Sequence, residues 1–174
     1  SPSPKNRHEA ASATGFSVAD AYGNAVSCTV TMNAPFGSGR VAQGTGILLA
    51  TAPDTRGRGA IGLAPMLMVN ENSQEFKFAA TASGGVAAPA ALVSVVANVF
   101  LAGQDLKTAI SQPRVHLSGD PDVTYYEPAM DDATLAALSA AGHRTAATPV
   151  IGLVNALYCP EGSIGEPETC QMAS

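Results

Sequence analysis

The chain has 174 residues, of which 46% are hydrophobic and 13% charged, and its formal net charge is −5. Its few lysines and arginines form no cluster, which argues against a nucleic-acid partner because phosphate binding needs a basic patch. The longest apolar stretch, 86–103, contains Pro89, Ser94 and Asn98, which favours a buried helix over a membrane span. The low charge favours burial of part of the surface against another chain; simple richness in Ala and Gly is the alternative.

The N-terminal part predicts an arm followed by a β-hairpin. Residues 1–12 are polar, lack periodicity and are expected to form a flexible arm. Two alternating strands are predicted at 14–20 and 25–32, on either side of a Tyr22–Asn24 turn. In the second strand one face is apolar, and the other is a row of polar side chains that leads into a glycine-rich loop: Ser27, Thr29, Thr31 and Asn33. Such a polar row can line a site at a sheet edge.

The rest of the chain alternates between hairpins, helices and short strands. A loop at 33–46 precedes a short buried strand at 46–49 and a surface loop at 50–62. The later segments are, in chain order, strands at 64–69 and 76–81, helices at 87–102 and 105–112, strands at 115–117 and 123–127, a helix at 131–141 and a strand at 151–158. Hairpins first, then paired helices, then further strands indicate an α+β fold rather than a parallel βαβ array.

Cysteine usage points to an oxidising compartment. Cys159 and Cys170 bracket a loop rich in Pro, Gly and Glu, so a disulfide is expected, with two free thiols as the alternative. A disulfide implies a periplasmic or secreted protein. Cys28 alternates with valines and is expected to be a small buried residue. The three histidines are scattered and no Cys-x-x-Cys occurs, so no metal site and no cofactor are expected.

Residues 16–37 carry a dense motif: Phe-Ser-Val, then Asp-x-x-Gly-Asn-Ala-Val-Ser, then Thr-x-Asn and Phe-Gly. This motif resembles the start of the small subunit of gamma-glutamyltranspeptidases, which are N-terminal-nucleophile hydrolases. The resemblance implies a four-layer αββα sandwich over 13–174, completed by a larger subunit cut from the same precursor, and a small-molecule amide substrate. In such enzymes the hydroxyl of an N-terminal residue attacks the amide carbonyl, and the α-amine of that residue is the base.

The resemblance places the nucleophile at an unexpected residue. In the register of the Phe-Ser-Val motif, the catalytic threonine of the family falls on Ala13. Thr14, one position later, is the candidate nucleophile if the chain is cut before it, although a shift of one residue turns a strand side chain to the opposite face. The alternatives are a catalytically inactive member with a structural or binding role, and an engineered replacement of a natural threonine at position 13.

Other family residues are partly kept. Thr31 matches the threonine that orients the nucleophile's amine, and Gly84 and Gly85 match the paired glycines of the oxyanion hole. Asn33 matches an asparagine that contacts the carboxylate end of the substrate. Pro-Arg-x-His at 113–116 matches a structural motif in which Arg114 is expected to form a salt bridge.

The residues that would bind the substrate's amino-acid end depart from the family pattern. The acidic residue that holds the α-ammonium group falls on Thr55, with Asp54 beside it. Two serines that bind the α-carboxylate fall on Ile61–Gly62, so their hydroxyls are missing. Losing a charged or hydrogen-bonded partner weakens binding, and an acyl specificity different from plain gamma-glutamyl is therefore expected.

Overall fold

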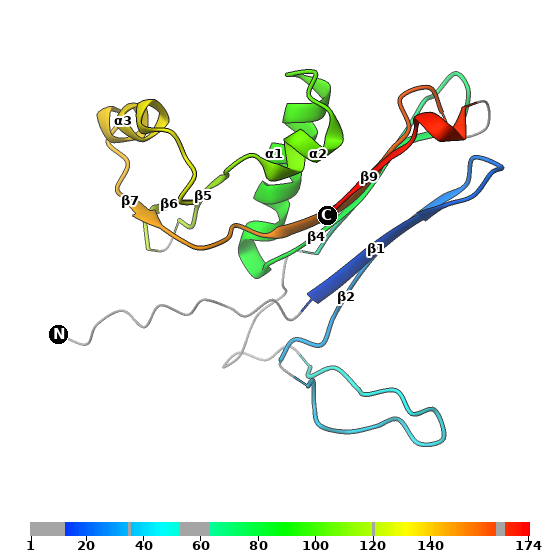
Figure 1. Ribbon diagram of the computed structural model, residues 1–174. Coiled ribbons are helices and arrows are strands. Elements are labelled where there is room, and N and C mark those ends of the chain that lie inside the picture. Colours follow the sequence, from blue (N-terminus) through cyan, green and yellow to red (C-terminus); the bar gives the residue numbers. More distant parts are fainter. Residues whose placement is uncertain (1–12, 35, 53–62, 120, 163–165) are drawn as a thin grey trace.

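A computed structural model describes residues 13–34, 36–52, 63–119, 121–162 and 166–174. The expected arm at 1–12 lies outside the described residues. The chain forms an α+β fold (Figure 1). Its elements are β1 (Ala13–Ala19), β2 (Ala25–Thr31), β3 (Ala64–Val69), β4 (Phe76–Ser83), η1 (Gly85–Ala87), α1 (Ala88–Phe100), α2 (Leu106–Ser111), β5 (Val115–Leu117), β6 (Thr124–Tyr126), α3 (Asp132–Ala140), β7 (Thr145–Ala147), β8 (Leu153–Tyr158), η2 (Pro167–Thr169) and β9 (Gln171–Ala173).

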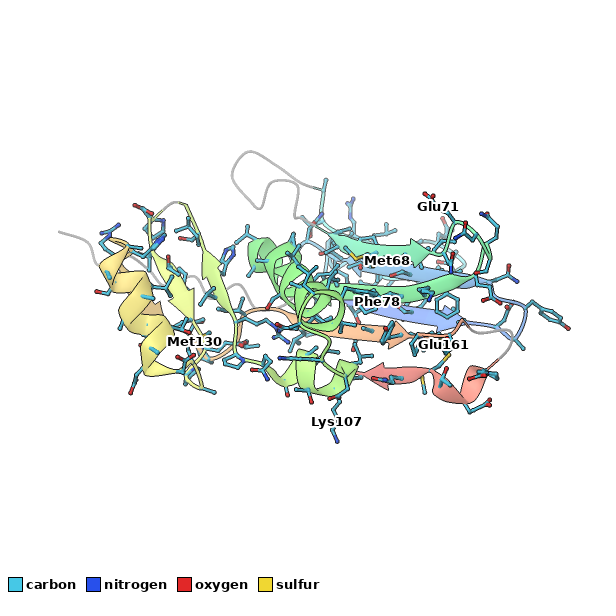
Figure 2. The ribbon with its side chains drawn as sticks, turned by 90° about the horizontal axis from the view of Figure 1, so that it is seen from above. Met68, Glu71, Phe78, Lys107, Met130 and Glu161 are labelled. Atoms are coloured by element: carbon cyan, nitrogen blue, oxygen red, sulfur yellow. A yellow bond between two sulfur atoms is a disulfide. The ribbon has the colours of Figure 1, made fainter. Side chains whose placement is uncertain are left out.

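The core lies between α1, α2 and an antiparallel sheet with the strand order β3-β4-β8-β9. Alternate residues of each strand point to the helices, and Figure 2 shows Met68 and Phe78 on neighbouring strands on the side where α1 crosses the sheet. Phe78 is fully buried. Its ring meets that of Phe100 edge-on, with centroids 5.6 Å apart, and lies tilted against that of Tyr158, with centroids 6.3 Å apart. Burying a side chain of this size contributes about 1.5–3 kcal/mol, so this cluster is a main source of the fold's stability.

Strands β1 and β2 form a separate two-stranded sheet that packs on the other face of β4. The alternation predicted for this hairpin is present, but the polar face points inward. Ser27 Oγ donates a hydrogen bond to Ala80 O at 2.5 Å, and Asn155 Nδ2 donates to Gly15 O at 3.3 Å. The apolar face points outward, where Phe16 is 51% and Val26 53% exposed. Helices, sheet and sheet make three successive layers of the expected αββα sandwich.

A third, smaller sheet lies beside α3, with the order β5-β6-β7. Strands β6 and β7 are parallel, with α3 as their connection, and Figure 1 shows this unit at one side of the molecule. Asp131 caps the start of helix α3, where its carboxylate accepts hydrogen bonds from the backbone and side chain of Thr134. The sequence predicted α3, β5 and β6, whereas β7 was not predicted.

Several detailed expectations are settled by the structure. The disulfide between Cys159 and Cys170 is confirmed, and it ties the end of β8 to β9, a strand that was not predicted. The expected buried strand at 46–49 is wrong, because this segment makes only an isolated bridge and Ile47 is 63% exposed. Cys28 is a partly exposed free thiol rather than a buried one, because its face of β2 points outward. Within the described ranges, no helix is both long and apolar enough to cross a membrane.

Candidate active site

The register of β1 against β2 decides which side chains can meet at the candidate site. Ala13 pairs with Thr31, and Thr14 pairs with Val30. Because side chains alternate, Ala13 and Thr31 lie on the inward face and Thr14 lies on the outward face. The structure therefore does not bring the hydroxyls of Thr14 and Thr31 together; the residue beside Thr31 is Ala13.

The end of β2 is fixed by Asn33, which adopts a left-handed backbone conformation with φ of 59°. Its backbone N–H donates to Thr31 Oγ1 at 3.1 Å, and its side-chain Nδ2 donates to Thr51 O at 2.7 Å. The backbone N–H of Thr51 in turn donates to Met32 O at 3.0 Å. Asn33 thus anchors the returning loop to the strand end, next to Thr31.

The two glycines after β4 make a sharp turn into the helical layer. Gly84 has φ of 128° and Gly85 has φ of 64°, which L side chains rarely adopt, so glycine is required at both positions. A 3₁₀ turn starts at Gly85 and continues directly into α1. A turn of this kind before a helix presents backbone N–H groups, as an oxyanion-binding site requires.

The glycine turn and the Ala13–Thr31 pair lie at the same end of the two sheets. Gly15 sits against Thr81 so closely that a Cβ on Gly15 would overlap the Thr81 side chain. Two residues before Gly15, β1 starts at Ala13. Two residues after Thr81, β4 ends at Ser83, which precedes the glycine pair. Figure 1 shows the start of β1 near the point where β4 runs into α1.

The structure adds Gly152, which sequence reasoning did not single out. A Cβ on Gly84 would lie 2.7 Å from the Gly152 Cα, so the backbones of these two glycines touch. Gly152 itself has φ of 67° and packs against Ala91 and the carbonyl of Ser83. The sequence signal for this contact is weak, because an isolated glycine before a strand has many ordinary explanations.

Two expected substrate-binding residues and one cavity remain to be placed relative to the candidate site. Asp54 and Thr55 lie outside the described residues. A cavity of about 430 Å³ lies at the other end of β1, lined among others by Val18, Phe76 and Met172, and so it is separate from the glycine turn.

The fold matches solved structures of one class. A threonine-to-alanine mutant of Helicobacter pylori gamma-glutamyltranspeptidase is 25% identical, with a TM-score of 0.72, covering 92% of this chain and 96% of that chain. A gamma-glutamyltranspeptidase from Pseudomonas nitroreducens has the same TM-score at 24% identity, with coverage of 92% and 93%. The chain therefore has the N-terminal-nucleophile hydrolase fold, in its small-subunit region.

Sequence comparison gives the family. The sequence model described as gamma-glutamyltranspeptidase matches residues 2–165. An acylase ACY 1 proenzyme from Pseudomonas sp. (strain SE83) is 33% identical over 174 residues, and the glutathione hydrolase proenzyme of Escherichia coli (strain K12) is 27% identical over 182 residues, each covering 90% of this chain. The chain belongs to the gamma-glutamyltranspeptidase family, and it spans about 30% of the length of these two relatives.

Proposed function

We propose that this chain is the small-subunit region of a precursor whose site transfers an acyl group, gamma-glutamyl or related, from an amide to water or to an amine. The observation that carries this proposal is the placement of the Ala13–Thr31 pair and the Gly84–Gly85 turn at one end of the sheets. The names of the relatives, an acylase proenzyme and a glutathione hydrolase proenzyme, agree with amide chemistry of this kind.

In the proposed reaction, a hydroxyl at a freshly cut chain start attacks the amide carbonyl while its proton passes to the α-amine of the same residue. The N–H groups of Gly84 and Gly85 stabilise the oxyanion, and Thr31 orients the amine. The resulting ammonium group returns the proton to the leaving nitrogen as the bond between the carbonyl carbon and that nitrogen breaks, and the acyl group stays on the hydroxyl oxygen as an ester. Water or a second amine attacks this ester and restores the hydroxyl. Asn33, Asp54 and Thr55 are proposed to contact the amino-acid end of the substrate.

The candidate nucleophile of the chain is Thr14. Its side chain faces away from Thr31, so it reaches the glycine turn only if β1 shifts by one residue. This placement, with Ala13 at the position beside Thr31, favours a second candidate function: a catalytically inactive family member with a structural or binding role.

The rest of the precursor is the proposed partner. The outward face of the β1–β2 sheet is apolar and half exposed, and among the described residues neither edge of this sheet has a neighbouring strand. Such a surface is normally covered, since exposed apolar patches and unpaired strand edges promote aggregation. The Cys159–Cys170 disulfide supports a periplasmic or secreted location.

The test uses the complete precursor and a variant with Thr14→Ala. Intact mass reports whether the chain is cut, and a chromogenic gamma-glutamyl anilide, with and without a dipeptide acceptor, reports acyl transfer. With Thr14 as nucleophile, the precursor gives a chain that starts at Thr14 and releases the chromophore, and Thr14→Ala abolishes both. An uncut precursor without turnover overturns this assignment and leaves the inactive family member.

A further inference from the structure

Arg114 is a buried charged residue with a specific set of partners. Its side chain is only 7% exposed. Nη2 donates to Ile110 O at 2.5 Å at the end of α2, and Nη1 reaches the carbonyl oxygens of Ile151 and Gly152 at 3.4 and 3.3 Å. The planar guanidinium therefore joins two segments that are about 40 residues apart in the chain, which a single ammonium group cannot do in the same way.

Glu127 completes this arrangement from the other side. Its Oε1 accepts a hydrogen bond from Ile151 N at 2.7 Å, and its Oε2 accepts one from Arg114 N at 2.8 Å. Glu127 Oε1 also lies 3.6 Å from Arg114 Nη1. Both the N–H and the C=O of Ile151 are thus held by a pair of opposite charges. Hydrogen bonds of this charge-assisted kind are stronger than neutral ones and fix a backbone position well.

The segment held by these charges supports the glycine turn directly. Gly152 follows Ile151 and touches Gly84, and a Cβ on Gly152 would lie 2.7 Å from the Ala91 Cβ and 3.2 Å from Ser83 O. Neither glycine leaves room for a side chain between them. A displacement of Gly152 is therefore transmitted to the turn between β4 and α1, because close-packed backbone has no slack to absorb it.

We propose that Arg114 and Glu127 are positioning residues for the Gly84–Gly85 turn, which they act on through Ile151 and Gly152 without touching the substrate. This inference rests on the proposed function for its chemical meaning and on the hydrogen bonds for its geometry. The oxyanion develops in the transition state and is absent from the bound substrate, so a misplaced turn lowers kcat and leaves KM nearly unchanged. A misplacement of about 1 Å costs on the order of 10²-fold in rate.

The first arm of the test measures backbone hydrogen exchange in the full precursor, over peptides that span 83–91 and 149–154. Arg114→Lys keeps the positive charge but loses the planar guanidinium with its several N–H donors, and Arg114→Met loses both. Glu127→Gln keeps the shape of the side chain and removes its negative charge. Arg144→Met is the matched control, since Arg144 also donates to a backbone carbonyl, that of Asp122, but in an exposed position. Val95→Ala, in the buried core, is the control for general loss of stability.

Backbone exchange at 83–91 is expected to be at least about 10-fold faster in Arg114→Met and Arg114→Lys than in Val95→Ala, when each variant is measured at the same interval below its own melting temperature. Exchange in Arg144→Met is expected to be unchanged. Equal exchange in the Arg114 and Val95 variants overturns the proposal. The second arm places Arg114→Lys in an Ala13→Thr precursor, where kcat should fall about 10²-fold with KM unchanged. An unchanged kcat also overturns it. A fully inactive Ala13→Thr precursor counts against the proposed function alone, because the exchange arm still decides the positioning role.

Discussion

Ala13 lies directly opposite Thr31 in the β1–β2 ladder, on the face that packs against β4. A hydroxyl placed at this position would stand beside Thr31 and at the end of the sheets where the glycine turn lies. The next residue, Thr14, has a hydroxyl but points to the other side. Under the proposed function, the residue at position 13 decides whether a hydroxyl lies beside Thr31 without a change of register.

Ala13→Thr in the precursor is expected to produce cleavage between residues 12 and 13 and hydrolysis of a gamma-glutamyl anilide. Gaining the nucleophile should raise turnover by roughly 10³-fold or more over the Ala13 parent. Intact mass and chromophore release measure the two effects. Thr14→Ala added to this variant is the control, and it should leave turnover within a few fold because the Thr14 side chain faces outward. Loss of turnover in the double variant would contradict the face assignment.

The contact between Gly15 and Thr81 predicts a strong dependence on side-chain size. Gly15→Ala forces a Cβ into the buried Thr81 side chain and should lower stability by about 1–3 kcal/mol. Thr81→Ala in the same chain should recover part of this loss, since it removes the atoms that collide. Thermal unfolding of the two single variants and the double variant measures the coupling. Additive effects would show that β1 and β4 do not meet at these residues.

The disulfide should stabilise the C-terminal strand. Cys159 and Cys170 close a short loop, which in the chain-entropy account contributes about 3 kcal/mol. The strand that follows also supplies the side chain of Gln171, whose Oε1 accepts a hydrogen bond from Leu106 N at the start of α2. Cys159→Ser with Cys170→Ser should lower the melting temperature and speed backbone exchange at 171–173. Addition of a reductant to the double variant should then have no further effect on either property.

His116 predicts a pH-dependent part of the stability. Burial lowers the pKa of His116 below its ordinary value of 6.5, and its Nε2 has no hydrogen-bond partner among the described residues. The folded protein thus prefers the neutral ring, so this contribution is present above pH 6.5 and is lost as the pH falls through the lowered pKa. Melting temperatures at pH 7 and pH 5 should differ more in the wild type than in His116→Gln. An equal difference would mean that protonation of His116 is not linked to folding.

The local elements of the fold were predictable because their signals are local. The helices predicted from Asp105 and from Asp131 and the Tyr22–Asn24 turn depend on residues within a few positions of the structure that they define, and the structure shows both aspartates as helix caps. Strands β7 and β9 have only three residues each and exist because a neighbouring strand is present, so their own sequence carries little information.

The candidate site also combines features with local sequence signals and features that depend on distant segments. The family resemblance suggested Thr31 and the glycine pair as site residues, and both remain proposals. Strand periodicity predicted that Thr14 and Thr31 lie on opposite faces, and the register of β1 against β2 agrees with this. Alternation defines two faces of a strand but not which layer each face meets, so the inward position of the polar row could not be predicted. Arg114 was expected to form a salt bridge, but its partner Glu127 and their joint contact with Ile151 could not be predicted, because they depend on how distant segments pack.

The outward position of Cys28 has a consequence for biogenesis. The chain has three cysteines, and two of them form the disulfide, so Cys28 is left as an odd thiol on an apolar surface opposite Phe16. In an oxidising compartment such a thiol can cross-link two nascent chains or exchange with the correct bridge. Covering this surface early would therefore protect the redox chemistry of the chain as well as its solubility, and would favour folding in one piece before any cut.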